Sequence, residues 1–153
     1  MIIDKQLIAL QQSVTSYKDI ITLLGERLYA AGYVTRQFTQ QVLHREKCYP
    51  TGLKMKPYNI AMPHTDPDHV IQSSIAIASL TEPVTFYRMD HPSKPIEVTI
   101  VFVLAVKESQ QQVKVIERLM NILRDQQFMK QLGQSNDENT IIEQLQYYLQ
   151  RGT

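Results

Sequence analysis

Apolar and polar residues follow one another in blocks along this chain, and each block predicts an element of secondary structure. The apolar run at residues 7–10 is compatible with a first buried strand. From Tyr17 onward apolar residues recur at helical spacing, with Ser16 placed to cap the start of the helix and Gly32 to end it. A second helix is expected at residues 36–47. The beginning of the chain is therefore predicted to be one strand followed by two helices.

The middle of the chain is predicted to be extended. The residue before a proline is pushed away from the helical conformation, so Met62, before Pro63, is expected to end a strand. Residues 73–80 alternate between small and branched side chains, and residues 84–88 form a further candidate strand. Residues 96–106 are apolar on both faces, which is typical of a central strand covered by helices.

The last part of the chain is predicted to be helical, because its apolar residues form two stripes at helical spacing. The first stripe consists of Val113, Ile116, Leu119, Met120 and Leu123. The second stripe consists of Ile141, Ile142, Leu145, Tyr148 and Leu149. Helices before and after a doubly covered strand imply an α/β fold, in which a β-sheet is sandwiched between α-helices.

The composition favours one domain spanning residues 1–153. With 43% hydrophobic residues, a chain of 153 residues can bury one core, at roughly two thirds of its unfolded surface. Its 16 lysines and arginines nearly balance its 15 aspartates and glutamates, so no strong field attracts nucleic acid or an anionic membrane. Any anion site must therefore be local.

Several features predict a cytoplasmic protein. The start of the chain lacks the pattern of a secretory signal. The longest apolar run, residues 100–106, is far shorter than the ~18 residues of a membrane span. A single cysteine can form neither an internal disulfide nor a multi-thiolate zinc site, which agrees with a reducing compartment.

His64 stands out among the four histidines because its local geometry is constrained. It follows Pro63, whose ring fixes φ and can hold a strand end while directing the next side chain outward. A neutral imidazole, with a reference pKa of ~6.5, can attack phosphorus and carry a labile phosphoryl group. Arg45 could compensate the phosphoryl charge, and Thr51 and Gly52 could offer a hydroxyl and backbone N–H groups. From the residues alone, a structural histidine beside an ordinary helix end and turn remains the alternative.

A metal site is a further alternative. The segment "HTDPDH" places His64, Asp66, Asp68 and His69 close together in sequence, and all four side chains are of types that bind zinc or other divalent ions. Such a site would suggest a metal-dependent hydrolase. Aspartate and proline also favour turns, so the segment has a purely structural explanation as well.

Four further residues are expected to have structural roles. His44 is expected on the solvent-facing side of its helix, and His91 in a surface turn. Cys48 is expected to pack in the interior, since a helix C-terminus disfavours a reactive thiolate. For Glu46, an ion pair at the helix end is expected rather than a part in catalysis.

Three stretches, "REKCYPTGL", "IAMPHTD" and "VFVLAVKESQQQVKVIERLM", resemble in order and spacing the enzyme IIA domain of the phosphoenolpyruvate-dependent sugar phosphotransferase system, in its fructose–mannitol class. The resemblance covers nearly the whole chain. It implies a mixed, mostly parallel β-sheet covered by helices on both faces, and it implies that His64 is the phosphoryl acceptor. The implied donor is the histidine-containing phosphocarrier HPr. The implied acceptor is a cysteine of enzyme IIB, which serves the membrane subunit IIC, and no metal or organic cofactor is needed.

Within this class the chain is most similar to galactitol-type IIA proteins, through "PTGL" and "ESQQQV", which implies uptake and phosphorylation of a galactitol-like polyol. The resemblance makes Arg45 and Thr51 candidates for binding the phosphoryl group or orienting the histidine. The chain departs from the mannitol–fructose pattern where a second active-site histidine usually stands, because Gln112 is the nearest match. A glutamine amide can donate a hydrogen bond to a phosphoryl oxygen but carries no charge, so Arg45 and backbone donors are expected to compensate the charge.

Two partners docking in turn would require an apolar surface with a polar rim around His64. Met62 and Tyr58 are candidates for it, and a place in the core is the alternative for either residue. One ring nitrogen of His64 must keep its lone pair, and the other must donate to a carbonyl or carboxylate that fixes the tautomer. The sequence does not identify this acceptor. A regulatory module of the same fold, in which phosphorylation of His64 changes partner binding, remains an alternative function.

Overall fold

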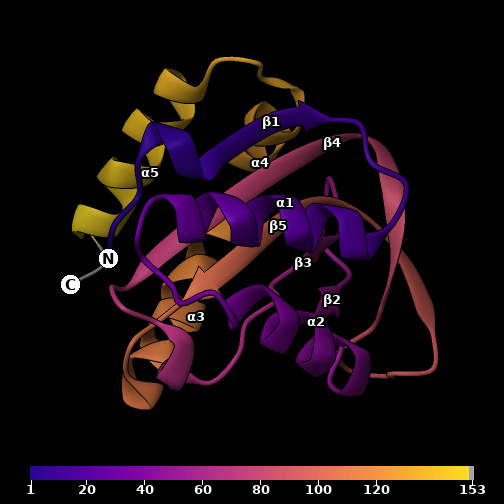
Figure 1. Cartoon of the computed structure of the whole chain (residues 1–153). Helices are drawn as coiled ribbons and strands as arrows, with labels where there is room; N and C mark the ends of the chain where they lie inside the picture. The colour runs from indigo at the N-terminus through magenta and orange to yellow at the C-terminus, as the bar shows by residue number, and fades with distance from the viewer. Residues whose placement is uncertain (152–153) are drawn as a thin grey trace.

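The computed structural model describes residues 1–151, with all of their side chains except those of residues 109 and 149–151. The described residues form a five-stranded sheet between two layers of helices (Figure 1). One face is covered by α1 (Tyr17–Ala30) and α2 (Phe38–Cys48), and the other by α3 (Ser109–Leu123), α4 (Gln126–Gln134) and α5 (Glu138–Arg151). Two short 3₁₀ helices, η1 (Lys5–Leu7) and η2 (Pro67–His69), lie in the connections. The predicted sheet between helices is confirmed.

The strands lie in the spatial order β1-β4-β5-β3-β2. Their bounds are β1 Ile8–Gln12, β2 Gly52–Leu53, β3 Ile60–Ala61, β4 Ser74–Tyr87 and β5 Pro95–Ala105. β1 pairs parallel with β4, and β3 with β5, whereas β4 with β5 and β2 with β3 pair antiparallel. The sheet is mixed, as expected, but the described strands make as many antiparallel as parallel pairings. β4 and β5 pair antiparallel because residues 88–94 connect them directly, whereas parallel neighbours need a crossover of a dozen residues or more.

β4 is longer than the sequence indicates. Residues 73–80 and 84–88 are predicted as separate strands, and this prediction is wrong because both segments pair with β5. A register shift between Ser79 and Val84 separates the two paired parts. The intervening residues 81–83 are exposed and include a proline, which gives them the composition of a loop. A proline has no N–H to donate and is tolerated where a strand ladder is irregular.

The helices at the start of the chain agree with the prediction. The Ser16 hydroxyl caps α1 by accepting a hydrogen bond from the Asp19 N–H at 3.2 Å. Gly32 follows the helix with a φ of +83°, a conformation that favours glycine. α2 begins at Phe38, two residues inside the predicted range of 36–47. These two helices pack against one face of the sheet and place the end of α2 beside β2 and β3 (Figure 1).

The C-terminal stripes need one correction. The buried residues of α3 are Val115, Leu119, Ile122 and Leu123. Val113, predicted on this stripe, is 61% exposed, because it lies off the face that Val115 and Leu119 turn toward the sheet. The helix α4, capped by the Asp125 side chain, separates the two predicted stripes.

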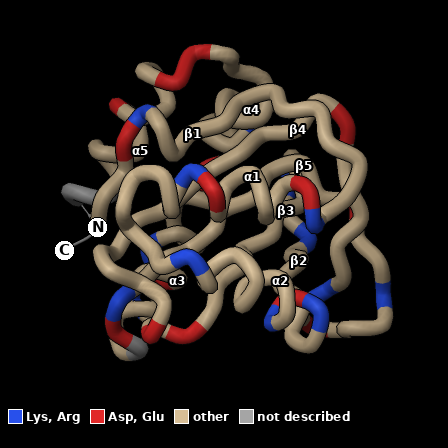
Figure 2. The backbone as a smooth tube through the Cα atoms, in the orientation of Figure 1, with Lys and Arg blue, Asp and Glu red and all other residues tan. Residues whose placement is uncertain are grey.

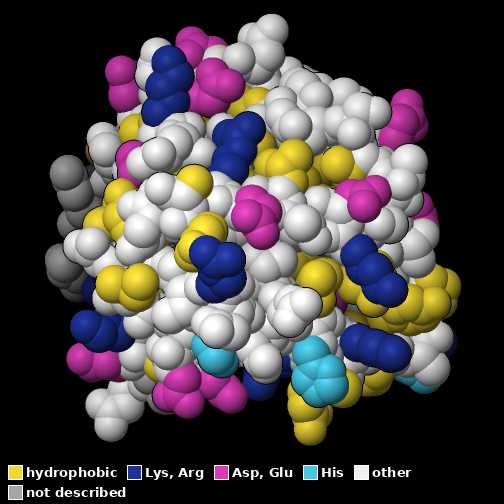
Figure 3. All heavy atoms as spheres, in the orientation of Figure 1, with side chains coloured by type: hydrophobic (Ala, Val, Ile, Leu, Met, Phe, Trp, Pro, Cys, Tyr) yellow, Lys and Arg dark blue, Asp and Glu magenta, His cyan; other side chains and the backbone are white. Residues whose placement is uncertain are grey.

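The surface carries charges of both signs. Lysine and arginine alternate with aspartate and glutamate along the backbone in Figure 2, and the face in Figure 3 shows both signs among small groups of apolar side chains. This mixture agrees with the formal net charge of +1. No helix in the described part of the chain is long and apolar enough to cross a membrane.

Candidate functional site

His64 lies just beyond the end of β3 and is held there by β5. The Leu104 N–H donates a hydrogen bond to the Pro63 carbonyl at 3.0 Å, and His64 itself forms a parallel bridge with Leu104. The extended backbone that Pro63 favours therefore continues the pairing of β3 with β5 as far as the histidine. His64 is half-buried, with its backbone position set by the sheet rather than by a loop.

The imidazole of His64 is fixed in one tautomer. Its Nδ1 lies 2.8 Å from the Met62 carbonyl oxygen, and because a carbonyl can only accept, Nδ1 carries the hydrogen and donates it. Nε2 therefore keeps the free lone pair. Burial is the main cause that lowers the pKa of His64 below its ordinary 6.5. The hydrogen bond to Met62 raises the pKa, the positive charge of Arg45 lowers it, and the negative charge of Asp66 raises it, so that the net effect is a lowered pKa. The ring is consequently neutral and nucleophilic at neutral pH.

Arg45, in the last turn of α2, brings a positive charge close enough to lower the pKa of His64. Its guanidinium lies over the Tyr49 ring, 5.4 Å from the ring centroid, and its Nη1 is 4.0 Å from Oδ1 of Asp66. The Nε of Arg45 is buried and has no hydrogen-bond partner among the described residues. Buried donors are nearly always paired in folded proteins, so this N–H is an exceptional unsatisfied donor on a charged side chain.

Thr51 is buried, and both its hydroxyl and its N–H are hydrogen-bonded to protein groups. Its hydroxyl donates to Oε1 of Glu46 at 2.7 Å and accepts from the Met62 N–H at 3.1 Å. Its own N–H donates to Oε2 of Glu46 at 2.7 Å. Thr51 thus holds the N–H of the residue whose carbonyl orients His64.

Glu46 is a site residue that the sequence analysis misses. It is only 5% exposed and has no ion-pair partner among the described residues, so the expected ion pair at the helix end is wrong. Burial raises its pKa to about 7, although the two hydrogen bonds from Thr51 work in the opposite direction. The position between Arg45 and Lys47 suggests a solvated ion pair, whereas the helix turns Glu46 inward with Val42, four residues earlier.

Gln112, in the first part of α3, reaches the segment that follows His64. Its Nε2 donates to the Thr65 carbonyl at 3.1 Å. This bond ties α3 to the backbone directly after the histidine. The structure therefore connects the other three residues singled out by the sequence to His64: Arg45 through its charge, Thr51 through Met62, and Gln112 through Thr65.

Cys48 differs from its expected place, and of the two docking candidates one lies in the core and the other packs against it. Cys48 is exposed instead of packed, because it lies two residues after the buried Glu46 and so on the opposite side of α2. Met62 is only 1% exposed and belongs to the core, so it offers no docking surface. Tyr58 is half-buried and packs against the core. His44 and His91 are exposed, as predicted.

The segment after His64 is arranged around hydrogen bonds. The Nδ1 of His69 lies 3.4 Å from the Thr35 hydroxyl, and Asp66 faces Arg45. Within residues 1–151, as far as their side chains are described, no three His, Cys, Asp or Glu residues lie together in a way that could hold a metal ion. The geometry gives the hydrolase alternative no support.

The chain matches the family model of the phosphoenolpyruvate-dependent sugar phosphotransferase system, EIIA 2, over residues 1–148. The chain belongs to this family. It is a IIA component of the fructose–mannitol class, and proteins of this kind are phosphotransferases that pass phosphate between proteins. The resemblance that the sequence motifs indicate is thereby confirmed.

Relatives of this IIA component include both transport and regulatory proteins. It is 28% identical over 120 residues to the galactitol-specific EIIA component of Escherichia coli strain K12, covering 78% of this chain and 79% of the relative. It is 31% identical over 143 residues to the transcriptional regulator ManR of Bacillus subtilis strain 168, covering 92% of this chain but 20% of the regulator.

Solved structures show the same fold. The crystal structure of IIA mannitol from Escherichia coli matches with a TM-score of 0.79 and 25% identity, over 94% of this chain and 98% of that one. The complex of enzyme IIAMTL with phosphorylated enzyme IIBMTL from Escherichia coli matches with a TM-score of 0.79 and 24% identity, over 98% of this chain and 99% of that one.

Proposed function

We propose that this IIA component carries the phosphoryl group on Nε2 of His64. The observation that carries the proposal is the hydrogen bond from Nδ1 to the Met62 carbonyl, because it leaves Nε2 as the ring nitrogen with a lone pair. The lowered pKa supports it, since the neutral ring is the nucleophile. The tautomer and the lowered pKa both leave Nε2 with its lone pair. The hydrogen bond sets the tautomer, and burial is the main cause of the lowered pKa.

The transfer consists of two displacements at phosphorus. The Nε2 lone pair attacks the phosphorus of a phosphohistidine donor, and the breaking bond returns its electron pair to the donor's imidazole. A cysteine thiolate of the acceptor then attacks the same phosphorus, and the electron pair of the N–P bond returns to Nε2. The ring is neutral again, and the phosphoryl oxygens carry negative charge throughout, which the site must compensate.

Arg45 is the residue that compensates this charge. Its buried Nε has no protein acceptor among the described residues, and its guanidinium already influences the pKa of His64. Thr51 acts as an orienting residue through the Met62 N–H, and Gln112 acts on the backbone after His64 through the Thr65 carbonyl. Because the Gln112 amide carries no charge, Arg45 takes the larger share of the compensation.

The phosphoryl donor is HPr and the acceptor is a cysteine of enzyme IIB, which in turn serves the membrane subunit IIC. The similarity to a mannitol IIA that forms a complex with phosphorylated IIB supports the second partner. All of these exchanges take place in the cytoplasm, with residues 1–153 acting as one IIA unit. The substrate of the complete system is a galactitol-like polyol, which the 28% identity to galactitol-specific EIIA components supports.

A regulatory role is the second candidate function. The 31% identity to a segment of the transcriptional regulator ManR, over 92% of this chain, favours it specifically. In that case His64 is phosphorylated and changes partner binding, but no sugar pathway is served.

Labelled phosphoryl transfer distinguishes the two functions. The protein is incubated with ³²P-labelled phospho-HPr and then with purified cognate IIB. Transport predicts acid-labile label on His64 that moves to IIB, whereas regulation predicts label that is loaded and stays. His64→Ala is expected to lose loading by at least about a thousandfold, because it removes the nucleophile. Undiminished loading of His64→Ala would refute both candidates, and His44→Ala, at an exposed histidine of α2, serves as the matched control.

A further inference from the structure

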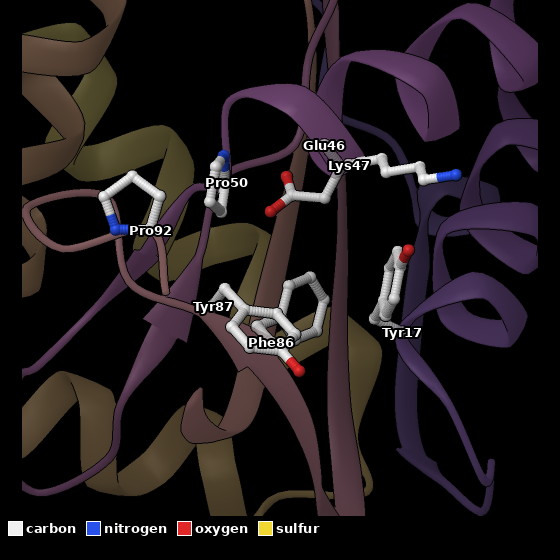
Figure 4. A pocket seen from close by; sticks show the side chains of 7 residues that line it. All are labelled: Tyr17, Glu46, Lys47, Pro50, Phe86, Tyr87 and Pro92. Atoms are coloured by element: carbon white, nitrogen blue, oxygen red, sulfur yellow. The ribbon is translucent and has the colours of Figure 1, made fainter. Parts of the chain in front are cut away.

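A cavity of about 240 Å³ is lined by Glu46, which also accepts the hydrogen bonds from Thr51. Figure 4 shows that the Glu46 carboxylate points into this cavity. The aromatic rings of Tyr17, Phe86 and Tyr87 stand around it, and the Tyr17 and Phe86 ring centroids are 5.7 Å apart. Most of the lining residues come from α1, α2 and β4, and the connections that follow α2 and β4 contribute Pro50 and Pro92.

Glu46 is an unusual residue to line such a cavity, because it is a buried acid without a cationic partner among the described residues. The ion pairs in the described part of the chain join Arg45 to Asp66 and Arg88 to Asp90. Lys47 also lines the cavity, but its side chain extends away from the Glu46 carboxylate in Figure 4. An unpaired buried carboxylate is costly, and its pKa of about 7 reflects that cost. A positively charged group that entered the cavity would pair with this carboxylate and so remove the cost of burying it unpaired.

We propose that this cavity binds a small organic ammonium ion. Its nitrogen pairs with the Glu46 carboxylate, and its apolar part packs against the rings of Tyr17, Phe86 and Tyr87. Aromatic faces attract cations, which adds to the pull of the carboxylate. The volume is below the roughly 300–1,000 Å³ of pockets for drug-sized molecules, so the ligand is smaller than these.

The other simple cations fit the cavity poorly. Magnesium and calcium ions take six or more oxygen ligands, most of them from carboxylates, carbonyls and water. The cavity offers one carboxylate and two phenol hydroxyls as oxygen ligands, and the rest of its lining consists of aromatic and proline rings and the Lys47 side chain. An organic cation uses both the charge and the apolar walls.

The cavity is linked to His64 by three hydrogen-bonded steps. Glu46 accepts both bonds from Thr51, the Thr51 hydroxyl accepts from the Met62 N–H, and the Met62 carbonyl accepts from Nδ1 of His64. A bound ammonium ion keeps Glu46 ionised and so strengthens its bonds from Thr51. The binding itself does not depend on the proposed phosphoryl transfer, and only its consequence for transfer rests on that function.

Binding can be measured by NMR titration of ¹⁵N-labelled protein with phenethylammonium chloride. We expect saturable shifts of the Thr51 and Met62 amide signals, and a Kd about tenfold lower at pH 8 than at pH 6, because ionised Glu46 rises from about a tenth to about nine tenths of the total. The other ionisable groups that line the cavity are Tyr17, Lys47 and Tyr87. The uncharged 2-phenylethanol, of similar shape, is expected to bind at least tenfold more weakly, and magnesium chloride to cause no shift of these signals.

Two variants separate the carboxylate from the rings. Glu46→Gln is expected to abolish both the binding and its pH dependence, while the exposed Glu82→Gln keeps them. Tyr87→Ala leaves the hydrogen bonds between Glu46 and Thr51 in place and is expected to raise the Kd several-fold, which keeps the test valid if Glu46→Gln is poorly folded. Absence of saturable shifts at pH 8, equal binding of 2-phenylethanol, or unchanged binding by both cavity variants would overturn the proposal. Binding without any transfer of label from phospho-HPr would refute the proposed function alone.

Discussion

At the scale of single residues, the reactivity proposed for His64 depends on a backbone carbonyl rather than on an acidic side chain. The Met62 carbonyl accepts from Nδ1 and cannot itself gain or lose a proton in the accessible pH range. The tautomer of His64 is therefore set by the fold. The acidic residue Glu46 does not contact the imidazole directly, because hydrogen bonds connect it to the ring only through Thr51 and the Met62 peptide.

Glu46 should make the stability of the protein fall as the pH rises. Its pKa is about 7 in the folded chain against an ordinary value of 4.5, so between these values the folded state binds more protons than the unfolded state. The stability that protonation provides is complete below about pH 4.5 and is lost as the pH rises through about 7, by about 3 kcal/mol. Urea unfolding at about pH 5 and about pH 8 measures this loss.

Glu46→Gln isolates the effect of this one group. A glutamine can accept from the Thr51 N–H and donate to the Thr51 hydroxyl, as a protonated glutamate does, without acquiring a charge. The difference between the wild-type and variant curves removes other titrations, including that of His64, whose lowered pKa acts in the opposite direction. Parallel curves for the two proteins would contradict a raised pKa at Glu46.

At the scale of elements, the site depends on how closely α1 packs on α2. Gly25 of α1 faces Thr39 of α2, and a Cβ added at Gly25 would lie 3.0 Å from Cβ and 3.1 Å from Cγ2 of Thr39, with the hydroxyl oxygen closer still. α2 also carries Arg45 and Glu46 in its last turn. The absent side chain at Gly25 therefore helps to set where both charged groups lie.

Gly25→Ala is expected to destabilise the protein by about 1 kcal/mol. Alanine favours a helix over glycine by about 1 kcal/mol, but overpacking at a tight contact costs about 1–3 kcal/mol, so the overlap with Thr39 outweighs the gain. Thr39→Ala removes two of the overlapping atoms, and the double variant should recover most of the loss in urea unfolding. A single Gly25→Ala variant more stable than the wild type would show that α1 and α2 separate freely.

The elements also show what a single sequence can predict. The capped helix α1 and the central β5 are correctly predicted, because Ser16, Gly32 and the apolar run carry local signals. The continuity of β4 is missed, since exposed residues 81–83 resemble a loop and only the segments on either side of them pair with β5. At the site, His64 follows from its motif, whereas the burial of Glu46 depends on tertiary packing. The spacing of four residues from Phe38 to Val42 to Glu46 is the one local signal for its burial, and the charged neighbours Arg45 and Lys47 obscure it.

At the scale of the whole molecule, partner recognition must be local. The net charge of +1 and the mixed surface provide no strong field to steer partners toward one face. Exposed apolar side chains stand beside residues of the site: Tyr49, 67% exposed, is covered by Arg45, and the exposed Val113 follows Gln112. Under the proposed function, HPr and IIB dock on this surface in turn.

Tyr49→Ala is expected to raise the KM for both phospho-HPr and IIB by roughly tenfold with a small change in kcat, because truncating an anchoring aromatic at an interface costs about 1–2 kcal/mol. Tyr29→Ala is the matched control, because Tyr29 is also exposed and also lies under an arginine. That arginine is Arg36, whose guanidinium is 5.7 Å from the Tyr29 ring centroid, whereas the arginine over Tyr49 is the site residue Arg45. Steady-state transfer with each partner varied in turn separates the two constants. A loss confined to kcat would mean that Tyr49 acts by placing Arg45 at the phosphoryl group, and a loss with only one partner would mean that HPr and IIB use different surfaces.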